Sequence, residues 1–114
     1  MTTTLTAEAV RGMGAGRQLD ALVAKHVMGW RGRPHRVHWP ERYSTDPAAA
    51  MQVVATMRAA GWIFTYDDDG EPCAGFYRHK DSEGYEVGSV AATGRDFCEC
   101  VCRAALLTVL EPAP

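Results

Sequence analysis

The segment "MGWRGRPHRVHWPERYSTD", residues 28–46, holds the densest group of side chains in this sequence that could bind a ligand. Arginine guanidiniums are planar, permanently charged donors that suit phosphate and carboxylate groups, and aromatic rings offer stacking faces for a nucleobase. The free N–H groups near Ser44 and Thr45 also suit a phosphate, although the charge of Asp46 occupies the same helix start. The candidate ligand-binding residues are Trp30, Arg31, Arg33, Arg36, Trp39, Arg42, Tyr43, Ser44 and Thr45.

The stretch between residues 31 and 42 follows neither a helical nor a strand period, and two interpretations of it stay open. In one, its four arginines hold an anion while Trp30 or Trp39 stacks on a base. In the other, the two tryptophans pack the loop onto the domain, and the arginines are solvated or paired with acidic turns. Those acidic turns come later in the sequence, at residues 67–71 and 81–86.

Groups that could act in catalysis lack the neighbours that catalysis needs. A nucleophilic enzyme sets its nucleophile beside a base in a context such as G-x-S-x-G, or places paired carboxylates beneath a pocket. Ser44, Ser82 and Ser89 have no such surroundings, and the acids gather in turns, where a solvated edge is the usual explanation. His26 lies on the apolar face of a predicted helix and is interpreted as a core residue. We therefore expect a protein that is not an enzyme and has no catalytic residue.

Four cysteines raise the question of a metal site. Cys98 and Cys102 are four residues apart and share one helical face, whereas Cys100 points to the other side. A zinc site needs four ligands, usually supplied in pairs by two segments. The second pair would have to be His35 with His38, or Cys73 with His79. Because cysteine also behaves as a small hydrophobic residue, we interpret Cys98 and Cys102 as core residues and expect no metal and no cofactor.

Double-stranded nucleic acid is a poor partner for this distribution of charge. The order α-β-β-β-α from residue 46 onward matches that of double-stranded-RNA-binding domains, which need lysines at the start of the last helix to contact phosphates. Here the corresponding segment "TGRDFCEC" carries Asp96 and Glu99, and the first turn between strands is "DDDGE". The net charge of the chain is −2. Since phosphate neutralisation dominates duplex binding, we expect no double-stranded nucleic acid partner.

The elements that would position these residues follow from hydrophobic periodicity. Apolar residues at helical spacing predict helices over residues 17–29 and 47–60. Alternation within residues 62–92, interrupted by the turns "DDDGEP" and "DSEG", predicts three short antiparallel strands. A capping box of Thr93 and Asp96 opens a last helix that runs to residue 109. We predict an α+β fold of order α-α-β-β-β-α, with a three-stranded antiparallel sheet sandwiched between helices.

The chain has the length of one domain, 114 residues, with an ordinary hydrophobic content of 46%. We divide it into a mobile or weakly ordered lead-in at residues 1–15, a single domain at 16–110 and a tail at 111–114. No apolar run reaches the length that crosses a bilayer, and the N-terminus lacks the basic start and apolar centre of a secretory signal. We expect an intracellular protein without a membrane partner.

Three segments together resemble the phage ABA sandwich domain family. They are "LDALVAKHVMGW", then "YSTDPAAAMQVV" followed by an aromatic strand, and the late "CRAALL". The resemblance covers roughly residues 17–109 in outline, and it implies a small protein encoded by a phage or prophage, with a layered helix–sheet–helix fold. The sequence departs from the family in its arginine-rich stretch and in the "CEC" ahead of Cys102. The resemblance brings no activity with it.

Two functions of different classes agree with these observations. In the first, a phage accessory protein sequesters an anionic nucleotide-like small molecule, for example a signal of a host defence system, through the arginines and aromatic residues of the 30–45 segment. In the second, a protein–protein adaptor inhibits a host factor through its acidic turns and aromatic strands. Either function would place the chain in the cytoplasm of the infected bacterial host. A small core and a short sheet with free edges also lead us to expect a homo-oligomer.

Overall fold

The computed structural model describes residues 6–29, 41–78 and 89–110. Within these residues the elements follow one another in the order α-α-α-β-β-β-α. Their bounds are α1 Ala7–Arg11, α2 Arg17–His26, α3 Pro47–Ala59, β1 Trp62–Asp67, β2 Cys73–Arg78, β3 Ser89–Thr93 and α4 Phe97–Leu110. The predicted α+β class and the three-stranded antiparallel sheet are confirmed, and α1 is an additional element.

Helix α1 lies in the segment that we predicted to be a mobile or weakly ordered lead-in. The Thr6 hydroxyl caps it by accepting a hydrogen bond from the Ala9 N–H at 3.1 Å. Val10 is completely buried, and the Arg11 guanidinium donates to the Ala91 carbonyl of β3 at 3.0 Å. Periodicity missed α1 because a helix of five residues is stabilised by packing, here on α4, rather than by its own propensity.

Helix α4 begins three residues later than the predicted capping box requires. Thr93 still belongs to β3, and Asp96 is itself the cap, since its carboxylate accepts from the Glu99 N–H at 3.0 Å. The Glu99 carboxylate accepts in return from the Arg95 N–H at 3.0 Å. Asp96 therefore occupies the cap position assigned to Thr93, and the Glu99 carboxylate accepts from Arg95, one residue before the cap, rather than from the N–H of the cap residue as in a capping box.

The sheet has the strand order β1-β2-β3, and both neighbouring pairs are antiparallel. Phe64 of β1, Phe76 of β2 and Val90 of β3 lie side by side in register, and this alternate set of residues faces the helices. The intervening residues, such as Thr65 and Ala91, lie on the opposite face and are exposed. The aromatic residues of β1 thus sit at one edge of the core.

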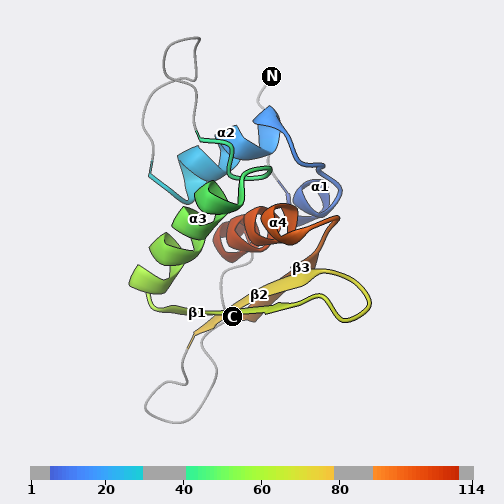
Figure 1. Cartoon of the computed structure of the whole chain (residues 1–114). Helices are drawn as coiled ribbons and strands as arrows, with labels where there is room; N and C mark the ends of the chain where they lie inside the picture. Colours follow the sequence, from blue (N-terminus) through green and yellow to red (C-terminus); the bar gives the residue numbers. More distant parts are fainter. Residues whose placement is uncertain (1–5, 30–40, 79–88, 111–114) are drawn as a thin grey trace.

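Helix α4 forms the centre of the molecule, between the sheet and the other helices (Figure 1). It packs on β2 and β3 with one side and against α1, α2 and α3 with its other sides. In the part of the chain that the structure describes, all helices lie on the same face of the sheet (Figure 1). This differs from our expectation that helices cover both faces, because α1–α3 stack on α4 instead. None of the described helices is long and apolar enough to cross a membrane.

Candidate functional site

The predicted ligand-binding segment is only partly within the described residues. Five of its candidates lie outside them: Trp30, Arg31, Arg33, Arg36 and Trp39. Of the remaining four, Arg42 and Thr45 are exposed, whereas Tyr43 and Ser44 are buried. Most of the predicted clamp therefore lies outside the described residues, and within them Tyr43 and Ser44 pack rather than face solvent.

Ser44 is fully engaged in holding the start of α3 against α2. Its hydroxyl donates to the Asp20 carboxylate at 2.6 Å or the Gly16 carbonyl at 3.2 Å, and accepts from the Gly16 N–H at 2.9 Å. Its own N–H donates to Asp20 at 2.8 Å. Asp20 is 2% exposed and Ser44 is completely buried. A hydroxyl with these partners is not available to a ligand, so Ser44 serves the fold.

Tyr43 is buried next to this network, with 7% of its surface exposed. Burial raises the pKa of its phenol, and the nearby carboxylates of Glu41 and Asp20 raise it further. A neutral, packed ring does not offer a stacking face to a base. Its role in the described structure is to fix the segment that precedes α3 onto the core.

The cysteines of α4 are all buried, as we predicted for Cys98 and Cys102. Cys100, which we placed on the other side of the helix, is buried as well because α4 is covered on both sides. Its thiol donates to the Pro72 carbonyl at 3.3 Å. Burial raises the pKa of Cys100 to about 11, and it raises the pKa of Cys98 and of Cys102 too. Among the described residues no group of three His, Cys, Asp or Glu side chains is arranged to hold a metal.

Glu99 and Arg103 form the most connected polar pair among the described residues, which the sequence pattern did not reveal. Glu99 is 6% exposed and accepts from the Ala15 N–H at 2.9 Å and from the Arg103 guanidinium at 3.2 Å. Arg103 also donates to the Met13 carbonyl at 2.8 Å and the Thr93 carbonyl at 3.0 Å. The pair joins the N-terminal segment, β3 and α4.

The pKa of Glu99 is set by opposing effects. Burial alone raises the pKa of this carboxyl group, but the N–H groups of Arg95 and Ala15 and the guanidiniums of Arg103 and Arg95 together lower it below its usual value. A carboxylate held in the charged form by four such contacts is a poor proton acceptor. We therefore assign Glu99 and Arg103 to the architecture of the fold.

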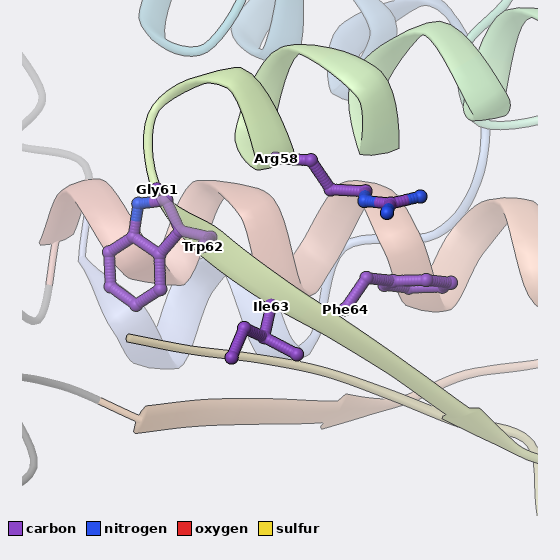
Figure 2. Close-up of a pocket in the computed structure, with 5 residues that line it drawn as sticks. All are labelled: Arg58, Gly61, Trp62, Ile63 and Phe64. Carbon is purple, nitrogen blue, oxygen red and sulfur yellow. The ribbon is translucent and has the colours of Figure 1, made fainter. Parts of the chain in front are cut away.

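An open cavity of about 470 Å³ lies where α3 ends and β1 begins. Its lining residues are Arg58, Gly61, Trp62, Ile63 and Phe64. Figure 2 shows Arg58 reaching from α3, with the side chains of the other residues standing along β1. Because successive strand residues point to opposite faces, Trp62 and Phe64 line the cavity on the helix side and Ile63 on the other. The cavity thus opens along the outer edge of the strand.

Aromatic contacts hold the walls of this cavity in place. The Arg78 guanidinium lies 4.4 Å from the centre of the Trp62 ring, and such contacts between cations and rings are attractive. The Phe64 ring lies 5.3 Å from that of Phe76 and 6.0 Å from that of Phe97. The helix-side wall is therefore built from rings that are packed on the core.

The two outer edges of the sheet differ. On β3 the carbonyls of Ala91 and Thr93 accept hydrogen bonds from Arg11 and Arg103, and Gly94 continues the ladder inward by donating to Pro72. Along an antiparallel strand the backbone N–H and C=O groups of successive residues point alternately to the two neighbouring sides. The pattern on β3 and the register therefore fix which β1 residues direct their N–H and C=O groups away from β2. They are Trp62, Phe64 and Tyr66. Between the described residues, no hydrogen bond closes this outer edge of β1.

Charge is distributed unevenly along β1. The start of the strand has the cations of Arg58 and of Arg78, the register partner of Trp62, and both are exposed. The end of the strand leads into an exposed acidic turn at residues 67–71. The open edge therefore runs from a basic end to an acidic end.

Comparison with known proteins gives one match. The family model for the phage ABA sandwich domain matches residues 21–106, which include the larger part of α2, all of α3 and of the sheet, and most of α4. No curated protein and no solved structure matches the chain. Since the matched range covers most of the sequence, this small phage protein belongs to the phage ABA sandwich domain family.

Proposed function

We propose that this phage protein is a non-enzymatic binding module that holds an extended segment of a partner protein along the outer edge of β1. This is the adaptor class of function that the aromatic strands and acidic turns indicate. In such strand addition, main-chain hydrogen bonds supply affinity, and pockets for alternate side chains supply specificity.

The observation that carries the proposal is the contrast between the two sheet edges. Arg11 and Arg103 occupy the carbonyls along β3, which protects that edge as natural proteins usually do. The outer edge of β1 has no such cover among the described residues, and the 470 Å³ cavity opens beside it. An added strand would place a side chain between Trp62 and Phe64.

Peptides selected from a random displayed library on the full chain test this proposal. Selected peptides should shift the backbone amide NMR signals of residues 62–66. Tyr66→Pro should weaken their binding at least tenfold, because proline removes an outward N–H without removing a ladder bond to β2. Tyr66→Val changes the same side chain but keeps the N–H, and it should bind within about threefold of the wild type.

Peptides that shift amides elsewhere, or that bind Tyr66→Pro as tightly as Tyr66→Val, would show that the edge of β1 is not the binding surface. The alternation of the selected sequences gives a second readout. A strand that pairs with β1 presents every other side chain to the cavity, so apolar residues should recur at every second position.

The sequestration of an anionic nucleotide-like molecule is a second candidate, and the lining of the cavity favours it. Arg58 supplies a cation, while Trp62 and Phe64 supply rings. The volume is also in the range of about 300–1,000 Å³ that ligand pockets have. The basic segment with Arg31, Arg33, Arg36, Trp39 and Arg42 stays an independent candidate for the same ligand.

Thermal-shift measurements with mono-, di- and cyclic nucleotides and ADP-ribose separate these sites. A ligand that binds only the folded chain stabilises it by about 2.7 kcal/mol at a hundredfold excess over its dissociation constant. Loss of the shift in Arg58→Glu assigns the ligand to the cavity, and loss in the double variant Arg33→Glu with Arg36→Glu assigns it to the basic segment. If none of these compounds raises the melting temperature, this second candidate function is ruled out.

A further inference from the structure

We propose that the segment held along β1 is the β1 strand of a second copy of this chain, so that two sheets join edge to edge in a two-fold symmetric dimer. This inference rests on the proposed use of the β1 edge and names its partner, so that selected peptides would compete with the second copy for the same edge. A symmetric dimer uses the same surface patch on both subunits. The two β1 strands then run antiparallel, with the axis beside Phe64.

The register of this pairing brings the large aromatic side chains of the two β1 strands together. With the axis beside Phe64, Trp62 of one copy lies opposite the partner's Tyr66. Tyr66 is one of the large apolar side chains that the described surface leaves exposed, at 36%. Its ring packs edge to face with that of Phe97, with the ring centres 5.0 Å apart. In the dimer it lies beside the cavity wall formed by the partner's Trp62.

The charges along β1 of one copy are complementary to those along β1 of a second copy only when the two strands run antiparallel. Antiparallel pairing brings the start of one strand, with Arg58 and Arg78, beside the end of the other, with Asp67 and Asp68. The two-fold axis repeats this match on the other side. Parallel pairing would instead set arginine beside arginine and aspartate beside aspartate, and like charges directly opposite are destabilising.

The closed edge of β3 explains why assembly stops at two copies. Once the β1 edges are paired, the outer edges of the joined sheet are the two β3 strands. Their carbonyls at Ala91 and Thr93 are already bonded to Arg11 and Arg103. A further copy finds no open edge of the same kind, so a discrete dimer is expected rather than a fibre.

A charge-swap series measured by sedimentation equilibrium of the full chain tests the dimer. The wild type should sediment as a dimer, and Arg58→Glu or Asp68→Arg should each raise the dissociation constant at least tenfold. The double variant carrying both changes restores the opposite charges across the axis, so its dissociation constant should return to within about threefold of the wild type. Lys25→Glu on α2 makes the same charge change away from the sheet (Figure 1) and should leave the mass unchanged.

A wild type that stays monomeric at all concentrations overturns the dimer. A double variant that dimerises as weakly as the single variants overturns it too. Selected peptides that still shift the amides of residues 62–66 would then leave the proposed binding function standing with a different protein as partner. A dimer that survives both Arg58→Glu and Tyr66→Pro would place the interface elsewhere. Far-ultraviolet circular dichroism of each variant confirms that it is folded before its mass is compared.

Discussion

At the scale of single residues, the buried polar groups of this protein connect segments and do not form a reactive site. Asp20 and Ser44 join α2 to the start of α3, and Glu99 with Arg103 joins the N-terminal segment to β3 and α4. Among the described residues, no buried side-chain nitrogen or oxygen lacks a hydrogen-bond partner. Polar residues in such positions act mainly on stability, because removing one partner leaves the other unsatisfied.

Ser44→Ala should lower the free energy of unfolding by about 1–3 kcal/mol. The change removes the acceptor of the Gly16 N–H and one of the donors to the Asp20 carboxylate, and both of these residues stay in place. Urea denaturation followed by tryptophan fluorescence measures the effect. Thr45→Ala, at the exposed neighbouring position, is the control and should change stability by less than about 0.5 kcal/mol. Equal effects of the two substitutions would mean that the buried network does not hold α2 to α3.

Glu99 should make stability depend on pH in the acidic range. Its pKa in the folded chain lies below its usual value, so its contribution is complete above the unfolded-state pKa of about 4.3 and is lost as the pH falls through the folded-state value. The difference in unfolding free energy between the wild type and Glu99→Gln should therefore narrow below about pH 4. Urea titrations between pH 3 and pH 7 measure it. Glu71→Gln, in the exposed turn, should show no such narrowing, and a constant difference for Glu99→Gln would contradict the assignment.

At the scale of elements, α4 is the central helix and β2 is the central strand, and other elements cover both. The sequence of α4 is apolar on nearly every side, and residues 98–102 and 104–107 are all buried, which is typical of a central helix. Strand β2 is paired on both sides, and its Gly75 lies between Thr65 of β1 and Ala91 of β3. The space at Gly75 is small: an added Cβ would lie 2.9 Å from the Thr65 Oγ1 and 3.3 Å from the Val90 carbonyl oxygen.

Gly75→Ala should therefore destabilise the protein, by about 1–3 kcal/mol, because the added methyl group forces the strands apart. The double variant Gly75→Ala with Thr65→Ala removes the closest contacting atom and should recover part of this loss. Thermal denaturation of the wild type, of both single variants and of the double variant gives the coupling between the two positions. Additive effects would show that the Thr65 side chain is not what limits the space at Gly75.

At the scale of the whole molecule, the helices gather on one face of the sheet and the two sheet edges differ in their cover. Arginines from α1 and α4 close β3, whereas β1 faces an open cavity with a basic start and an acidic end. This asymmetry among the described residues is the basis of the proposed binding along β1. In the proposed dimer, the same asymmetry would limit assembly to two copies.

The proposed dimer predicts that the melting temperature depends on protein concentration, since only the folded chains would associate. Raising the concentration from about 1 to about 100 times the dissociation constant should raise the Tm measurably, and Arg58→Glu should flatten this dependence. Differential scanning calorimetry over that range provides the measurement. A Tm that stays constant for the wild type across the range would argue against association of the folded chains.

The sequence by itself determined the helices α2, α3 and α4, the three strands and their antiparallel order, because hydrophobic periodicity and turn residues such as Gly61 and Asp68 act locally. Its resemblance to the phage ABA sandwich family is also confirmed. Only the tertiary structure decided what depends on distant parts of the chain. It turned Tyr43 and Ser44 from ligand candidates into core residues, since Asp20 reaches Ser44 across 24 positions. It also revealed the cavity at Arg58 and a contrast between the two sheet edges within the described residues, because the arginines that close β3 come from helices at both ends of the sequence.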